Sequence, residues 1–202
     1  MTSWDKYSDA AERWSDEQYA DVRAYLSHRA ELVRTLGPRL LPGATVLDLA
    51  CGDGALADFL PEQRYIGVDA SGEMVAAGRQ RGRELVQADL NEYAPSQQVQ
   101  ATTIFRAIYY ARDRRALLVR IAGYTEQKLV FDLNPRQYRL DDVRADLLAA
   151  GFDRLDVRPF FVPQTRAVSL LTWLERSGPL ARLLLRYRFT VICAASRPSA
   201  AS

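Results

Sequence analysis

From residue 45 onward, apolar positions alternate between short continuous runs and segments with helical spacing. The short runs have the length and composition of buried strands: Thr45–Leu49, Tyr65–Val68, Leu85–Ala88, Thr102–Phe105, Leu129–Asp132, Leu155–Val157 and Phe189–Ala194. Helix-like segments separate most of them: Ala55–Leu60, Gly72–Arg79, Arg114–Ala122 and Asp142–Ala150. Alternating strands and helices predict an α/β fold, with a mostly parallel sheet covered by helices on both faces. Such sheets bind ligands beyond the carboxyl ends of their strands.

The chain before this alternation has a different pattern. Ser15–Gln18 resembles a helix capping box, and Val22, Leu26, Ala30 and Val33 follow at helical spacing until Gly37 and Pro38. We therefore expect residues 1–40 to form an N-terminal helical arm that precedes a core of residues 41–158. The arm is rich in aromatic side chains, namely Trp4, Tyr7, Trp14, Tyr19 and Tyr25.

A second appended region, residues 159–186, separates the last two expected strands. Its apolar residues fall at helical spacing in two groups, and Gly178 and Pro179 lie between the groups. The pattern predicts a helical insert, which could be a cap over a pocket, a dimer surface or an element on a membrane surface. We favour the cap because the apolar stripes are narrow and the net charge is low. Residues 187–197 would then contribute the final strand of the core.

Composition narrows the function classes. A chain of 202 residues predicts one main domain, and a net charge of +2 is too small to indicate nucleic-acid binding by itself. Cys51 and Cys193 give no disulfide framework and no zinc cluster. His28 is the single histidine, which excludes mechanisms that need a histidine pair. The sequence contains neither an apolar run of 18 residues nor a signal peptide, so we expect a cytoplasmic protein.

Three successive strands are expected to end in an acid. The first acid, Asp48, opens the loop Asp48–Gly54, whose small residues would let a ligand approach the backbone closely. Asp69 ends the second strand, 21 residues later, where a carboxylate suits a ribose diol. Asp89 ends the third strand and could accept a hydrogen bond from an adenine amino group. This combination predicts a nucleoside-binding edge of the sheet.

With these motifs, the sequence resembles the class I S-adenosylmethionine-dependent methyltransferases over about residues 40–158, together with the final strand. The resemblance implies a Rossmann-like sheet of seven strands, with the last strand antiparallel between the fifth and the sixth. It implies S-adenosylmethionine as cofactor and an N-terminal arm that forms a lid. The implied cofactor-binding residues are Asp48, Ala50, Cys51, Gly52 and Gly54 for the methionine half, Asp69, Ala70 and Met74 near the ribose and adenine, Ala88, Asp89 and Leu90 at the adenine, and Phe105 as a cover. Ala50 replaces the first glycine of the family loop.

The acceptor is less clearly marked. Candidate general bases are Tyr109, Tyr110 and His28, and candidate acceptor-binding residues are Tyr7, Arg106, Tyr109, Arg136 and Trp173. Arg106 occupies a strand end where a metal-dependent relative would need an acid, so we expect no metal. The fourth strand lacks the proline-containing motif of base-directed relatives, so nucleic acid is not favoured as acceptor.

These observations favour methyl transfer to a small acceptor that is apolar or aromatic, and Arg106 and Arg136 add an anionic acceptor as an option. Membrane contact is not favoured, and the oligomeric state is left open. Two alternatives remain: an enzyme of the same fold that binds the cofactor for other chemistry, and a non-catalytic accessory subunit.

Overall fold

The structure is a computed structural model, and it describes residues 22–160, 173, 178–184 and 190–197. Its seven strands are β1 (Thr45–Leu49), β2 (Arg64–Asp69), β3 (Leu85–Gln87), β4 (Val99–Ile104), β5 (Thr125–Leu133), β6 (Arg154–Pro159) and β7 (Val191–Ser196). The helices are α3 (Val22–Thr35), α4 (Gly72–Gln80), α5 (Arg114–Tyr124), α6 (Leu140–Ala150) and α8 (Gly178–Leu184), with short 3₁₀ helices η1 (Ala55–Phe59) and η2 (Ile108–Tyr110).

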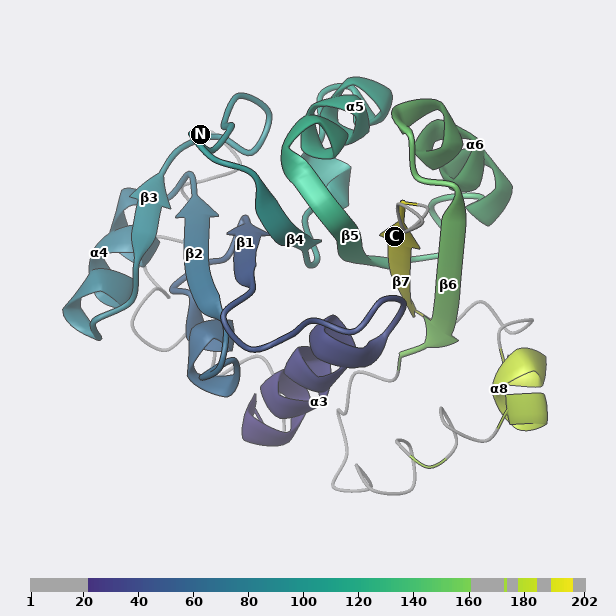
Figure 1. The fold of residues 1–202 in the computed structure, drawn as a ribbon, viewed down its shortest axis with the longest axis horizontal. Coiled ribbons are helices and arrows are strands. Elements are labelled where there is room, and N and C mark those ends of the chain that lie inside the picture. Colours follow the sequence, from purple (N-terminus) through teal and green to yellow (C-terminus); the bar gives the residue numbers. More distant parts are fainter. Residues whose placement is uncertain (1–21, 161–172, 174–177, 185–189, 198–202) are drawn as a thin grey trace.

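The strands form one sheet in the order β3-β2-β1-β4-β5-β7-β6 (Figure 1). β1 pairs in parallel with β2 and β4, and β7 is antiparallel to both β5 and β6. The chain winds outward from β1 to β3 and then returns to β4, so the strand order reverses between β1 and β4. The predicted α/β fold with a last antiparallel strand is confirmed, and the reversal marks the place where open α/β sheets bind ligands.

Both faces of the sheet are covered because strand side chains alternate between them. Leu47 and Leu49 of β1 face the core that α5 and α6 close, whereas Val46 faces the core closed by α3, η1 and α4. Figure 1 shows α5 and α6 together on one side of the sheet and α3 on the opposite side. By the same alternation, Asp48 faces the side of α3.

A lysine in the middle of β5 ties α3 to the sheet. The Lys128 side chain is fully buried, and its Nζ donates to the carbonyl oxygens of Leu36 at 2.8 Å and Arg34 at 3.4 Å, at the end of α3. Desolvation lowers the pKa of this amine to about 7, although Asp156 opposes that shift. The amine thus donates hydrogen bonds to carbonyl groups that the end of the helix leaves without intrahelical partners.

Several expected elements differ in their bounds. β4 begins at Val99 and β5 at Thr125, earlier than the apolar runs suggest, because these two residues pair before a register shift at which the polar Gln100 and Gln127 lie. The segment that follows the glycine loop is a 3₁₀ helix rather than an α-helix.

The predicted appended regions are only partly described. Residues 1–21, with Tyr7, and most of the predicted insert lie outside the described residues, so the arm and the cap stay predictions. α8 shows that part of the insert is helical, as its spacing predicted. No helix in the described ranges is long and apolar enough to cross a membrane.

Candidate functional site

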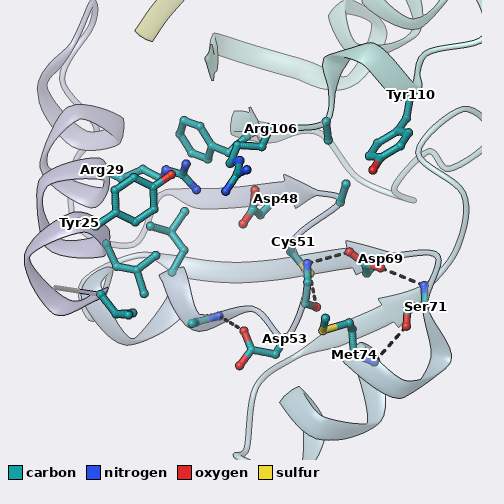
Figure 2. A pocket seen from close by; sticks show the side chains of 18 of the residues that line it. Tyr25, Arg29, Asp48, Cys51, Asp53, Asp69, Ser71, Met74, Arg106 and Tyr110 are labelled. Atoms are coloured by element: carbon teal, nitrogen blue, oxygen red, sulfur yellow. Dashed lines mark hydrogen bonds between the residues drawn. The ribbon is translucent and has the colours of Figure 1, made fainter. Parts of the chain in front are cut away.

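A pocket opens beyond the carboxyl ends of β1, β2 and β4, at the reversal of strand order, and α3 forms one of its walls (Figure 2). Its lining comprises Val22, Tyr25, Leu26, Arg29, Asp48, Ala50, Cys51, Gly52, Asp53, Ala55, Leu56, Asp69, Ser71, Met74, Phe105, Arg106, Ala107, Tyr109 and Tyr110. The structure therefore brings most of the glycine loop together with Asp69 and the end of β4 at one pocket.

The glycine loop is anchored to the end of β2. The backbone N–H of Gly52 donates to Oδ2 of Asp69 at 2.7 Å, and the N–H of Cys51 donates to the carbonyl of Val68 at 3.0 Å. Ala50 has a φ of 57°, which is left-handed backbone. A non-glycine residue costs roughly 1–2 kcal/mol in this conformation, and this explains why the family favours glycine here.

Two glycines of the loop serve different purposes. Gly52 has a φ of 61°, and a Cβ added to it would meet no protein atom within 4 Å. Because Gly52 lines the pocket, that open space is where a ligand would lie. Gly54 has a φ of 74° and does not line the pocket; its Cβ would lie 2.8 Å from Cδ2 of Leu85. Gly54 therefore permits close packing of the loop on β3, rather than close approach of a ligand.

Asp69 organises the second part of the site. Its Oδ1 accepts the backbone N–H of Ser71 at 2.9 Å, while Oδ2 accepts that of Gly52. Burial raises the pKa of Asp69, and these two backbone bonds oppose the shift. Ser71 in turn caps α4 by accepting the N–H of Met74 at 3.3 Å. The carboxylate is thus fixed in orientation, and each of its oxygens retains acceptor capacity for a ligand hydroxyl.

Asp48 is a buried carboxyl, 4% exposed, at the floor of the pocket. The Thr103 hydroxyl donates to Oδ1 at 2.6 Å, and the Tyr65 hydroxyl donates to Oδ2 at 2.8 Å. Desolvation raises its pKa to about 6, against the two hydroxyls and the Arg29 cation, which stabilise the carboxylate. Asp48 therefore titrates nearer to neutrality than an exposed aspartate does.

Sequence reasoning missed Arg29, which comes from α3. Its guanidinium is buried between two rings, 4.4 Å from the centroid of Tyr25 and 4.2 Å from that of Phe105. Burial raises the pKa of both Asp48 and Asp132, and the same cation opposes that rise at each of them. The four-residue spacing of Tyr25 and Arg29 places both on one helical face, but the neighbouring apolar stripe obscured this signal.

At the end of β4, Arg106 leaves the strand with a φ of 53°. Its backbone N–H donates to Oδ1 of Asp132, a buried carboxylate at the end of β5, at 2.6 Å. Burial raises the pKa of Asp132, and Arg29 and Arg106 oppose that shift. Sequence reasoning singled out Arg136 just after this strand and missed the contact that Asp132 makes with Arg106.

The two tyrosines of η2 lie together at the pocket. Their ring centroids are 4.4 Å apart, both residues line the pocket, and Tyr109 is 48% exposed. This places aromatic surface beside Arg106 at the pocket.

Other predicted site residues lie elsewhere. Asp89 does not line the pocket; its carboxylate accepts from Asn91 and pairs with Arg112 at 2.7 Å. His28 stacks on Phe160 and lies 3.6 Å from Glu31, and Trp173 is 60% exposed. Four more predicted residues are absent from the lining: Ala70, Ala88, Leu90 and the exposed Arg136. Within the described ranges, no three His, Cys, Asp or Glu side chains are grouped as a metal site.

Comparison with known proteins gives a consistent result. The model of a family described as "Methyltransferase domain" matches residues 46–127. Trans-aconitate 2-methyltransferase of Azoarcus sp. is 32% identical over 134 residues, which cover 62% of this chain and 52% of the relative. The chain therefore spans about half the length of the curated relatives that it matches.

Solved structures extend the likeness to the whole fold. A chain in the solved complex between the Haloferax volcanii Trm112 methyltransferase activator and a putative methyltransferase has a TM-score of 0.69 at 17% identity, covering 98% of this chain and 99% of that one. Magnesium protoporphyrin IX methyltransferase from Synechocystis PCC 6803 has a TM-score of 0.65 at 17% identity, covering 96% and 95%. Residues 46–127 therefore match a methyltransferase domain, and the chain as a whole has the fold of these solved methyltransferases.

Proposed function

We propose that this protein binds S-adenosylmethionine in the pocket of Figure 2 and catalyses transfer of its methyl group to a small acceptor. One observation carries the proposal: Gly52 offers open space above a loop whose backbone is fixed by Asp69, at the point where the strand order reverses. The position and chemistry of these residues fit a nucleoside with a flexible charged tail.

Residues on both sides of the loop would hold different parts of the cofactor. The Asp69 carboxylate would accept hydrogen bonds from the ribose hydroxyls, with Met74 beside the base. Arg29, buried next to Asp48, is the cation placed to meet the carboxylate of the methionine tail. Asp89 could accept from the adenine amino group while Arg112 occupies part of its acceptor capacity.

The bound cofactor supplies an activated methyl group on a sulfonium, so the protein has to orient the acceptor and exclude water. Phe105, Tyr109 and Tyr110 provide aromatic surface at the pocket, in keeping with an apolar or aromatic acceptor body. The name of the curated relatives, trans-aconitate 2-methyltransferase, supports an acceptor that carries a carboxylate. If a proton must leave the acceptor, Tyr109 and Tyr110, which line the pocket, are candidate general bases.

Product analysis tests the reaction class. The protein is incubated with S-adenosylmethionine carrying a labelled methyl group and with small carboxylic acids, trans-aconitate first. S-adenosylhomocysteine formed in step with a labelled methyl product supports methyl transfer. Consumption of the cofactor without that product would indicate other chemistry on the same fold, and failure to bind the cofactor would indicate an accessory subunit.

A further inference from the structure

The backbone at Arg106 is unusual for the residue that occupies it. Within the described ranges, Ala50 and Arg106 are the non-glycine residues with positive φ, and Arg106 is much the larger. Glycine would adopt this conformation without strain, so the fold itself does not require a long side chain here. Strained backbone of this kind persists where surrounding contacts over-determine it, and it clusters at functional sites.

Asp132 is the contact that determines this backbone. β4 and β5 run in parallel with Ile104 opposite Phe131, so the two chain ends leave the sheet side by side. The carboxylate of Asp132, 7% exposed, then accepts the Arg106 N–H at 2.6 Å. A buried carboxylate is costly unless it is hydrogen-bonded and compensated by charge, and here Arg29 and Arg106 compensate it. A buried acid of β5 thus holds the backbone of an exposed arginine at the end of β4.

The result is a guanidinium at the pocket wall. Arg106 lines the pocket together with Ala107 and Tyr109, although its side chain is exposed overall. Figure 2 shows Arg106 on the side of the pocket away from Ser71 and Met74. The planar donor fork of an arginine matches the two oxygens of a carboxylate.

We infer that Arg106 is a specificity-determining residue that binds a carboxylate of the methyl acceptor, and that Asp132 is the positioning residue that holds Arg106. The inference rests on the proposed function and names the substrate class for the same pocket. The acceptor is favoured over the cofactor tail as the source of this carboxylate because Arg29 is the cation that acts on Asp48 at the glycine loop, whereas Arg106 is held at the end of β4 by Asp132.

The inference also defines how the carboxylate is used. A carboxylate held by two arginine donors has lone pairs engaged on both oxygens, which makes it a poorer nucleophile. The group bound by Arg106 therefore anchors the acceptor, and another group of the acceptor receives the methyl. The neighbouring rings of Tyr109 and Tyr110 would contact the acceptor body.

Equilibrium binding tests the inference without a known reaction. The protein is first titrated with S-adenosylhomocysteine, and the loaded protein is then titrated with trans-aconitate and trans-cinnamate, each compared with its neutral methyl ester. We expect at least one acid to bind the parent and its ester to bind tenfold or more weakly. Arg106→Gly, which keeps the backbone conformation, should weaken binding of the acid at least tenfold and change the dissociation constant of S-adenosylhomocysteine less than twofold. The affinity of Arg106→Lys for the acid should lie between those of the parent and of Arg106→Gly.

Asp132 variants separate positioning from general structural damage. Asp132→Asn keeps an oxygen that can accept the Arg106 N–H, so acid binding should stay within about threefold of the parent. Asp132→Ala removes that acceptor and should weaken acid binding about as much as Arg106→Gly does. A merely structural role would weaken S-adenosylhomocysteine binding to the same extent.

Four results would overturn the inference. The first is that neither acid binds the loaded parent, and the second is that Arg106→Gly binds the acid as tightly as the parent does. In the third, Arg106→Gly weakens S-adenosylhomocysteine instead, which would assign the arginine to the cofactor tail. In the fourth, the parent fails to bind S-adenosylhomocysteine, and this result would refute the proposed function as well.

Discussion

The buried carboxyl of Asp48 makes folding stability depend on pH in a direction that can be measured. Its pKa is about 6 in the folded protein, against 3.8 for an unperturbed aspartate. Between these two pH values the folded state binds more protons than the unfolded state, so folding stability falls as pH rises. The stabilising contribution of Asp48 is fully present below pH 3.8 and is lost as pH rises through about 6. Replacing Asp48 by Asn removes the titration and nearly preserves the shape.

The size of the effect follows from the interval between the two pKa values. About two pH units correspond to about 3 kcal/mol. The asparagine oxygen can accept the Tyr65 hydroxyl, which now lies 2.8 Å from Oδ2. The Thr103 hydroxyl can accept from the new amide and donate to the carbonyl of Leu47, 3.5 Å away. We therefore expect Asp48→Asn to gain about 3 kcal/mol relative to the parent between pH 4 and pH 7.5.

Urea denaturation of both proteins at several pH values measures this difference, because shared titrations cancel in the comparison. Asp153→Asn, at an exposed acid before β6, controls for the change in net charge. A difference between Asp48→Asn and the parent that stays constant within about 0.5 kcal/mol from pH 4 to pH 7.5 would refute the assignment of a buried, destabilised carboxylate.

Two further predictions concern the loop and the end of α3. Gly52→Val should weaken cofactor binding at least tenfold, because its Cβ would fill open space in the pocket and its φ of 61° disfavours a β-branched residue; equal affinity in a folded variant by calorimetry and circular dichroism would contradict this. The Lys128 amine, whose pKa is about 7 in the folded protein, is deprotonated more readily there than in the unfolded chain. The parent should therefore gain stability between pH 7 and pH 9.5 relative to Lys128→Met. A difference in the free energy of unfolding between the two proteins that stays constant across this range would contradict the buried amine.

The sheet could be predicted from the sequence because its strands are continuous apolar runs separated by helical spacing. The runs Thr45–Leu49 and Tyr65–Val68 correspond closely to β1 and β2. The starts of β4 and β5 could not be placed, because the first pair, Val99 with Thr125, is separated from the apolar runs by a register shift at which the polar Gln100 and Gln127 lie. The antiparallel place of β7 came from the family resemblance, not from its own pattern.

Some residues of the candidate site could likewise be predicted from the sequence, and others could not. The place of Asp48, Asp69 and Gly52 at the pocket could be predicted because each lies at or just beyond the end of a strand, where parallel sheets bind ligands. Arg29 and Asp132 were not, because their contacts depend on how α3 and β5 pack against β1 and β4. Asp89 fits the family pattern, yet its pairing with Arg112 appears only once the chain is folded.

Calorimetric titration with S-adenosylmethionine tests the central claim, that this pocket binds the cofactor, most directly. The parent should bind, and Asp69→Ala should bind about 5- to 150-fold more weakly, because it loses the acceptor for the ribose hydroxyls and for the Gly52 N–H, which corresponds to about 1–3 kcal/mol. Asp153→Ala, at an exposed acid outside the pocket, should bind as the parent does. No heat of binding with the parent, or equal affinity for the parent and Asp69→Ala, would contradict the account.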